Sequence, residues 1–222
     1  RSSRRWRRAA LAQMEALVRR DRHRPSVILW GMGNESRSRR AYSELRDSVR
    51  RLDPSRPTIY AENHLYRARR HKTVGIPQVW STNYELDVLD DAKEASEWRL
   101  VVLSECCNHP QSVRGDDLEE LTQLAVIERE WEVMDDRPSL VGHLVWCFAD
   151  YATEHRGRTR RQPGLVDAWR QPKMAAELFR ARYAREPFIS LHILQTRRGS
   201  PATRFRTEIA DPHGGRSSHR LH

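Results

Sequence analysis

Apolar and polar positions along the chain follow two patterns, one helical and one of short continuous runs. The first helical pattern consists of Leu11, Met14, Leu17 and Val18. Because these residues recur at helical spacing, they predict an amphipathic helix. The apolar run at 27–30 comes next and leads into Gly31 and Gly33, so it predicts a buried strand that ends in a turn.

The two patterns then repeat in alternation over most of the chain. Further helices are expected at 41–52, 88–98, 118–134 and 173–183, of which 88–98 is poorly patterned. Further strands are expected at 58–61, 77–84, 100–103 and 140–148. Strands separated by helices favour parallel pairing with crossover helices, which places the chain in the α/β class.

The expected strands are fewer than those of a closed eight-stranded parallel barrel, which needs about 250 residues. The predicted fold is therefore an incomplete (β/α)8 TIM barrel with about strands 4–8 present, formed by residues 1–195. Residues 196–222 are basic and lack an apolar period, so they are expected to be a disordered tail. A further strand at 188–194 is the alternative for the start of this region.

The distribution of charge suggests a second kind of function only for the ends of the chain. The formal net charge is +10, which fits a binder of nucleic acid or of another anionic surface. In the middle of the chain, however, Arg46 and Arg50 are interspersed with Asp47 and Asp53. Such a mixture is typical of a solvated helix face, so nucleic-acid binding is the less favoured alternative.

Cysteine usage and hydropathy exclude several classes of protein. Cys106 and Cys107 are adjacent and Cys147 stands alone, which gives neither a disulfide framework nor metal-ligand spacing. We therefore expect no metal and no cofactor. No run approaches the roughly 18 apolar residues of a membrane span. The chain starts within a helical pattern, so we expect upstream sequence, and the compartment stays open.

Two carboxylates follow predicted strands. Glu35 comes after the strand at 27–30, and Glu105 comes after the strand at 100–103. A single Glu in such a place is more often a helix cap or a solvated loop acid. In a parallel barrel, however, all strands deliver their carboxyl ends to the same mouth. Two carboxylates in one cleft, one protonated and one ionised, form the layout of glycoside hydrolysis.

The residues around Glu35 resemble a known family. His23 to Trp30, followed by Gly33-Asn34-Glu35, are similar to the strand-4 signature of glycoside hydrolase family 2, the β-galactosidase and β-glucuronidase family. The resemblance covers residues 11–189 and includes 142–150 at strand 8, 164–167 and 171–173. It implies a general acid/base at Glu35, a hydrogen bond from Asn34 to the sugar 2-hydroxyl, and a nucleophile at Glu105, at the end of strand 7.

The same resemblance assigns expectations to further residues. Tyr84 would hydrogen-bond the nucleophile and keep it ionised, although it could equally be a packing tyrosine. Trp146 would form an apolar floor under the sugar ring, with a core tryptophan as the alternative. Asn63 and His64 would line the cleft, and the alternative for His64 is a solvated loop residue.

Two departures from the family pattern concern the site. Glu105 is followed by Cys106-Cys107-Asn108, where the family has Glu-Tyr-Gly or Glu-Phe-Gly. Glucuronidases also carry an Asn-x-Lys pair after strand 8 that binds the uronate carboxylate. Residues 158–162 contain no such pair, although the arginines there could substitute for it. A glucuronide substrate is therefore not favoured.

The sequence thus predicts a retaining β-glycosidase, β-galactosidase-like, that acts on a carbohydrate substrate by double displacement. The first alternative is an inactive, truncated fragment of such an enzyme, because half a barrel leaves open sheet edges. The second alternative is the basic nucleic-acid binder. We expect that N-terminal domains of the same protein, as well as barrel strands 1–3, lie outside this chain. The sugar and the oligomeric state stay open.

Overall fold

The protein is seen here in a computed structural model that describes residues 4–109, 111–155, 158–192, 207–209 and 217–219. The chain divides into two units. The first consists of Arg1–Cys106 with Glu132–Val145, and the second of Cys107–Trp131 with Trp146–His222. Each unit contains buried apolar residues of its own, such as Trp80 in the first and Leu178 in the second.

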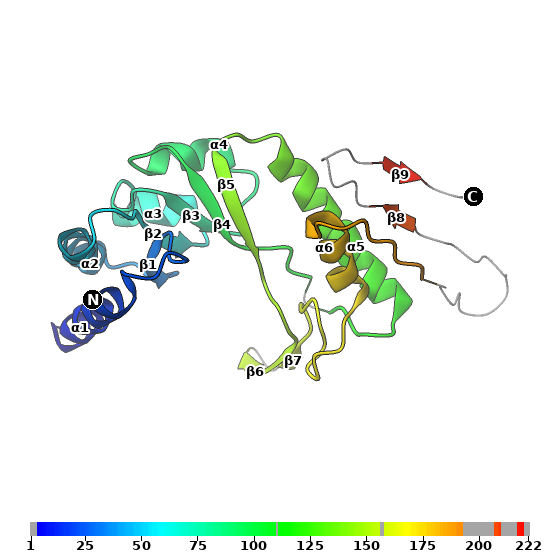
Figure 1. Ribbon diagram of the computed structural model, residues 1–222. Helices are drawn as coiled ribbons and strands as arrows, with labels where there is room; N and C mark the ends of the chain where they lie inside the picture. Colours follow the sequence, from blue (N-terminus) through cyan, green and yellow to red (C-terminus); the bar gives the residue numbers. More distant parts are fainter. Residues whose placement is uncertain (1–3, 110, 156–157, 193–206, 210–216, 220–222) are drawn as a thin grey trace. The chain divides into compact units, whose positions relative to one another are not determined.

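The first unit is built on a five-stranded parallel sheet (Figure 1). Its strands, in chain order and in spatial order, are β1 (Trp30–Asn34), β2 (Thr58–Glu62), β3 (Trp80–Asn83), β4 (Val101–Cys106) and β5 (Leu140–Val145). Every neighbouring pair is parallel. The predicted α/β class is confirmed, and sequential parallel strands are those of part of a barrel.

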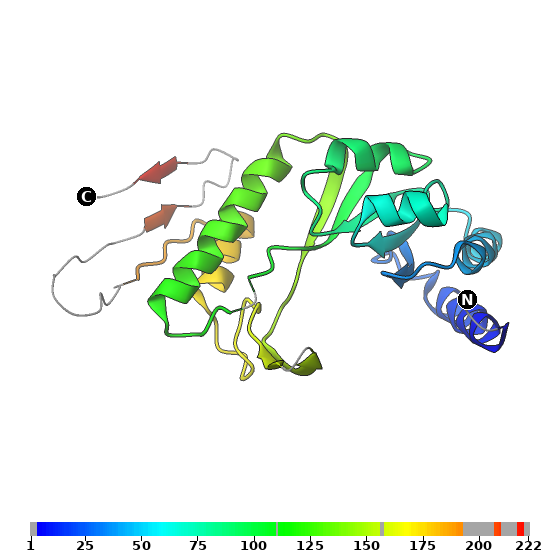
Figure 2. The same ribbon diagram turned by 180° about the vertical axis from the view of Figure 1, so that it is seen from behind.

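One helix precedes these strands, and other helices connect them. They are α1 (Arg4–Asp21), α2 (Arg39–Leu52), α3 (Leu65–His71), α4 (Leu89–Ala92) with the 3-10 turn η1 (Lys93–Ala95), and α5 (Asp117–Asp135). Helices α3 and α4 lie in front of the sheet in Figure 2. The helix expected at 88–98 is shorter than predicted and consists of one turn of α-helix and one 3-10 turn. Its apolar positions keep no helical period, so they give no continuous face to bury.

The edge strands differ from the prediction. The strand expected at 27–30 begins only at Trp30, and Ile28 is 71% exposed. The strand expected at 140–148 ends at Val145, and Leu144 is 58% exposed. Within the described residues, β1 and β5 each pair with a single strand. A strand without a second neighbour has less to cover its side chains, so the expected complete burial does not occur.

Aromatic residues form the core behind β2 and β3. The rings of Tyr42 and Tyr60 are stacked with centroids 4.2 Å apart, and Trp80 meets Tyr60 edge-on at 5.5 Å. The Tyr60 hydroxyl donates to Thr73 Oγ1 at 2.5 Å, which satisfies a buried polar group. Trp80 is fully buried.

The second unit contains the hairpin β6 (Tyr151–His155) and β7 (Arg158–Arg161), the helix α6 (Met174–Tyr183) and the first part of α5. Trp131 of α5 packs edge-on against Phe179 of α6, with ring centroids 4.9 Å apart. The side chain of Arg182 lies over the Trp131 ring at 4.4 Å. These contacts pack α6 against α5.

The end of the chain is described only in part. Of the expected tail at 196–222, residues Thr207–Ile209 (β8) and Ser217–His219 (β9) form a short antiparallel pair, and the others lie outside the described residues. Residues 188–192 form no continuous strand, although Leu191 makes an isolated β-bridge, and the rest of the alternative strand at 188–194 lies outside the described residues. In the part of the chain that the structure describes, no helix has the length and apolar character needed to cross a membrane.

Candidate active site

Polar side chains gather where the strands of the first unit end. Asn34 closes β1 and Glu35 follows it, Glu62 closes β2, Asn83 closes β3, and Glu105 lies near the end of β4. Because all five strands are parallel, these residues share one edge of the sheet. Ligands of parallel α/β proteins bind at the carboxyl ends of the strands. This edge is therefore the candidate site.

Asn83 connects the first carboxylate to the neighbouring strands. Its Nδ2 donates to Asn34 Oδ1 at 3.0 Å and to Glu35 Oε1 at 2.9 Å. Its Oδ1 accepts from Ser104 Oγ at 2.7 Å. The Asn83 side chain is fully buried, so these contacts fix the orientation of its amide. Asn83 thereby holds Glu35 and links it to the side chains of Asn34 on β1 and Ser104 on β4.

Tyr84 holds the second carboxylate. Its hydroxyl donates to Glu105 Oε2, which is the hydrogen bond that the resemblance implied. Its backbone N–H also donates to the carbonyl of Glu105, at 2.8 Å. Two contacts between the same residues leave the phenol little freedom relative to the carboxylate. Tyr84 remains 37% exposed, so this side of the site is open to solvent.

Burial and charge tune two carboxyl groups of the site. Burial raises the pKa of Glu105, the hydrogen bond from Tyr84 counteracts this, and the charge of Glu35 raises the pKa further. Burial also raises the pKa of Glu62, which is only 2% exposed, and the charge of Glu35 adds to that rise. Two neighbouring carboxylates repel each other, so ionisation of one disfavours ionisation of the other. This is how one carboxyl group can stay protonated beside an ionised one.

The backbone turns sharply where these strands end. Glu35 (φ 46°), Tyr84 (φ 64°) and Cys107 (φ 59°) all have left-handed backbone conformations, although none is glycine. The N–H of Glu35 donates to the carbonyl of Ala61 at 2.8 Å, which anchors the turn to β2. Such conformations cost about 1 kcal/mol or more per residue and persist only where surrounding contacts enforce them.

Asn63 and His64 are turned toward other partners. His64 Nδ1 lies 3.1 Å from Glu85 Oε1, and Asn63 Oδ1 accepts from Arg67 Nη1 at 3.3 Å. The other carboxylate oxygen of Glu85 accepts the N–H of Leu65 at 2.7 Å. Within the described residues, the structure does not join these two side chains to the hydrogen-bond network of Asn83.

Trp146 belongs to the second unit. Its Nε1 donates to the Tyr151 hydroxyl at 3.3 Å, and the two rings meet edge-on with centroids 6.1 Å apart. The ring is partly exposed. Its expected place under a sugar ring stays a prediction.

The thiol of Cys106, next to Glu105, belongs to no cluster of metal ligands in the described part of its own unit. Cys106 is fully buried, donates to the carbonyl of Leu144 at 3.3 Å, and lies 3.6 Å from His143 Nδ1. Within either unit taken by itself, the described residues bring together no group of three His, Cys, Asp or Glu ligands.

Asn83, Glu62 and Ser104 were not predicted from the sequence. Asn83 and Glu62 are strand-end polar residues like Asn34, and that position is the signal that could have found them. The hydrogen bonds of Asn83 to Asn34 and Glu35 span almost fifty positions, which no local pattern encodes.

A parallel α/β sheet with polar and acidic residues at its carboxyl edge is the arrangement found in barrel enzymes. Residues 1–187 match the family described as "Glycosyl hydrolases family 2, TIM barrel domain". The chain therefore belongs to glycoside hydrolase family 2, and its parallel sheet is part of that family's TIM barrel. The resemblance noted in the sequence is confirmed.

Individual relatives are β-glucuronidases. The chain is 31% identical over 204 residues to the β-glucuronidase of Homo sapiens, with 77% of this chain and 30% of the relative covered. It is 28% identical over 206 residues to that of Rattus norvegicus, with 79% and 31% covered. The solved β-D-glucuronidase of Dictyoglomus thermophilum matches with a TM-score of 0.67 and 28% identity, covering 82% of this chain and 36% of that one. The chain thus spans about a third of the length of these relatives.

Proposed function

We propose that this chain carries the catalytic pair of a retaining β-glycosidase, with Glu35 as general acid/base and Glu105 as nucleophile. The observation that carries the proposal is the pair of anchored carboxylates at one sheet edge. Asn83 holds Glu35, and Tyr84 holds Glu105. Membership of glycoside hydrolase family 2 supports the same reaction class.

The proposed reaction has two displacements. Glu35 gives its proton to the glycosidic oxygen while Glu105 attacks the anomeric carbon, so the bond to the leaving group breaks and a glycosyl-enzyme forms. Glu35, now ionised, then takes a proton from water, and the hydroxide displaces Glu105. Such a mechanism needs the two carboxyl groups about 5–5.5 Å apart. The hydrolysed sugar is released with its original anomeric configuration.

Other residues have supporting roles in this proposal. The side-chain oxygen of Asn34 accepts a hydrogen bond from Asn83, and its side-chain NH2 would donate to the sugar 2-hydroxyl. Tyr84 would keep Glu105 ionised for attack. Trp146 would stack on the sugar, and Asn63 and His64 would contact substrate only after leaving Arg67 and Glu85.

Two observations bear on which sugar is the substrate, and they point in different directions. The β-glucuronidase relatives support a β-glucuronide as substrate. The β-galactosidase-like specificity expected from the sequence has no support from these relatives. The missing Asn-x-Lys pair at 158–162 argues against strong uronate binding. Parallel assays with p-nitrophenyl β-glucuronide and β-galactoside therefore test the sugar independently of the reaction class.

The first prediction concerns the catalytic pair. We expect Glu105→Gln to abolish hydrolysis, because an amide cannot form the glycosyl-enzyme. We expect Glu35→Gln to lose about 10²–10⁴-fold in kcat with a poor leaving group, and much less with a dinitrophenolate, which needs no proton. Steady-state assays of the 222-residue chain measure both effects. Glu94→Gln, an exposed substitution on η1, is the matched control and should keep full activity.

Two outcomes would reject this proposal. Equal background rates for the chain and for Glu105→Gln would favour the inactive fragment. A first-formed product of inverted configuration, seen by proton NMR, would exclude the retaining mechanism.

A further inference from the structure

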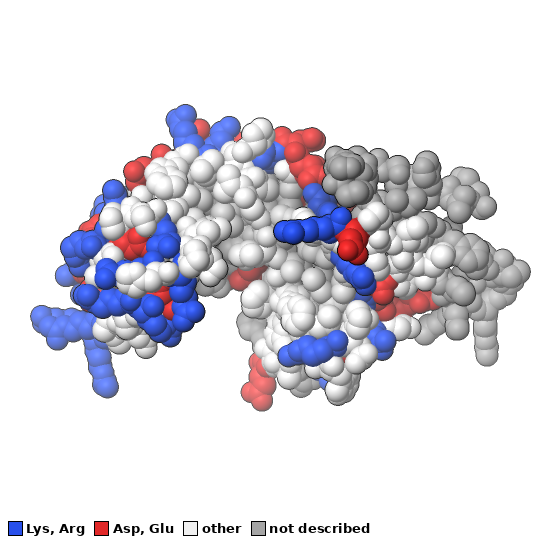
Figure 3. Space-filling view, viewed as in Figure 1, with Lys and Arg blue, Asp and Glu red and all other residues white. Residues whose placement is uncertain are grey.

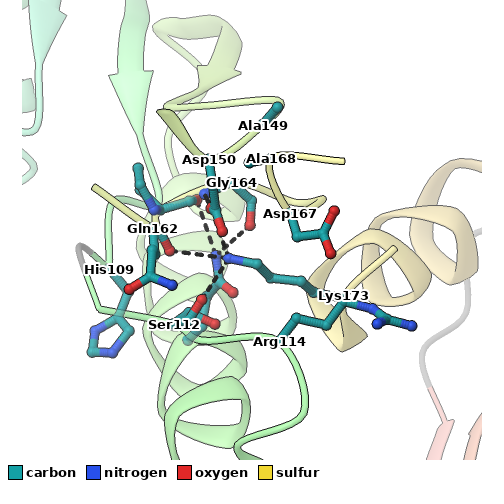
Figure 4. Close-up of polar contacts among 12 residues, drawn as sticks. His109, Ser112, Arg114, Ala149, Asp150, Gln162, Gly164, Asp167, Ala168 and Lys173 are labelled. Atoms are coloured by element: carbon teal, nitrogen blue, oxygen red, sulfur yellow. Dashed lines mark hydrogen bonds and ion pairs between the residues drawn. The ribbon is translucent and has the colours of Figure 1, made fainter. Parts of the chain in front are cut away.

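The second unit contains a fully buried lysine whose ammonium is surrounded by oxygen atoms. Lys173 Nζ donates to the carbonyl of Ser112 at 2.5 Å, to Asp150 Oδ1 at 2.8 Å and to the carbonyl of Gln162 at 3.1 Å (Figure 4). The Lys173 side chain is 0% exposed, and the Asp150 side chain is 7% exposed. An ammonium has three N–H donors, and each of them has an acceptor here.

The carboxylate partner is itself fixed by the backbone. Asp150 Oδ1 also accepts the N–H of Gly164 at 2.9 Å. A Cβ atom at Gly164 would collide with backbone atoms of Ala149, Asp150 and Val166, so this close approach requires glycine. The ion pair is therefore built into a tightly packed backbone junction. Burial of an isolated charge would be very costly, so pairing and complete hydrogen bonding are what make Lys173 tolerable there.

The three acceptors come from different stretches of chain. Ser112 lies in the segment 107–116 that follows β4, the strand that carries Glu105. Asp150 lies in the segment 146–150 that follows β5, and Gln162 follows the β6–β7 hairpin. One side chain at the start of α6 thus ties all three together.

Further contacts anchor the same junction. Arg114 Nε donates to the carbonyl of Pro172 at 3.1 Å, next to Lys173. The two carboxylate oxygens of Glu120 accept the N–H groups of Gly115 (2.7 Å) and Met174 (2.6 Å). The segment after β4 is therefore bound to the beginning of α6 by further backbone and side-chain contacts just after Ser112.

We propose that Lys173 is a positioning residue that fixes the segments following β4 and β5. In barrel enzymes, the loops that follow the strands build the active-site mouth, and small displacements there are costly for catalysis. Lys173 acts through Ser112 and Asp150, the partners of its ammonium. The catalytic part of this inference rests on the function proposed above, whereas the anchoring part does not.

The test replaces Lys173 in the full chain and measures two properties. Lys173→Met keeps most of the side-chain volume but removes the charge and the donors. We expect amides in 107–116 to exchange with deuterium about tenfold faster or more, while β2 and β3 keep their protection. We expect kcat to fall by about tenfold or more, because the loops that follow β4 and β5 are misplaced.

Leu178→Ala is the matched control. It removes a buried side chain from the same helix, α6, and leaves the ammonium contacts in place. At equal loss of thermal stability, it should keep kcat and the exchange of 107–116 close to those of the parent. Equal kcat losses in both variants would reduce Lys173 to a stabilising residue and overturn the proposal.

A second variant covers the case in which Lys173→Met does not fold. Asp150→Asn keeps an oxygen acceptor and removes the negative charge, and we expect faster exchange in the same segment. Unchanged exchange of 107–116 in the folded variants would overturn the anchoring role. If the parent chain itself hydrolyses no glycoside, the proposed function fails, and the exchange measurement still decides whether Lys173 anchors the loop.

Discussion

At the scale of single residues, the charge state of Glu105 depends on its partner Tyr84. Burial and the charge of Glu35 raise the pKa of Glu105, and only the phenol hydrogen bond opposes them. A nucleophile must be ionised to attack, so the acidic limb of the pH profile of kcat/KM reports this group in the proposed mechanism.

The second prediction follows from this opposition. In Tyr84→Phe the pKa of Glu105 should rise further, because the bond that stabilises its ionised form is gone. The acidic limb of kcat/KM should therefore move to higher pH, measured with a β-glycoside assay over an acidic to neutral range. Tyr66→Phe removes an exposed phenol and should leave the limb in place. A limb that stays or moves to lower pH in Tyr84→Phe contradicts the argument.

Single residues also show which parts of the candidate site could be predicted from the sequence and which could not. Glu35, Glu105 and Tyr84 could be predicted because each follows an apolar run, and a family pattern names those positions. Asn83 could not, since its importance lies in contacts with Asn34 and Glu35 that exist only after β1 and β3 are brought into one sheet.

At the scale of elements, Asp53 joins the end of α2 to β1 and to the loop that precedes β2. It caps the end of α2, and its Oδ2 accepts from Trp30 Nε1 at 2.9 Å and from Arg56 Nη1 at 2.7 Å. Its Oδ1 accepts from Ser55 Oγ at 2.5 Å. Burial alone would raise the pKa of Asp53, but these hydrogen bonds hold it well below its ordinary value.

The third prediction is the stability of Asp53→Asn. We expect the free energy of unfolding to fall by about 2–3 kcal/mol at neutral pH, because charge-assisted hydrogen bonds in a buried place are lost. A folded pKa below the unfolded value means that this stabilisation is full above the unfolded pKa of about 3.9 and is lost as pH falls below it. Urea unfolding at neutral and acidic pH measures the difference. Asp47→Asn, at an exposed ion pair, should change little.

Elements with strong periodicity were the predictable ones. The helices α1, α2, α5 and α6 and all five parallel strands correspond to predicted segments. Helix α3 was missed because it is only seven residues long and ends in Arg69, Arg70 and His71, which obscure any apolar face. The hairpin β6–β7 was missed because its residues are mainly polar and charged.

At the scale of the whole molecule, open sheet edges coexist with a high positive charge. Among the described residues, β1 and β5 have one strand partner each, and Ile28, Val141 and Leu144 are 71%, 55% and 58% exposed. Figure 3 shows Lys and Arg gathered over α1 and α2 in the first unit. Exposed edges favour association between chains, and a net charge of +10 opposes it.

The fourth prediction is the salt dependence of association. The 222-residue chain by itself should be mainly monomeric at low salt and should associate as salt screens its charge. Light scattering after size-exclusion chromatography at several salt concentrations measures this. Leu144→Lys should reduce the association, because it adds a charge to the β5 edge. A chain that stays monomeric at high salt would show that its edges are not adhesive.

The left-handed backbone at Glu35, Tyr84 and Cys107 lowers the stability of the fold. At Glu35 and Tyr84 the side chains of the proposed mechanism require residues other than glycine, so stability and the proposed catalysis make opposite demands there. Glycine adopts such a conformation without strain, so Glu35→Gly should melt at a higher temperature than Glu35→Ala. Selection for thermal stability alone would therefore favour glycine at Glu35 and Tyr84, the two turns that carry the proposed chemistry. Attempts to stabilise this chain by consensus or by design should leave these strained positions unchanged and seek their gains elsewhere.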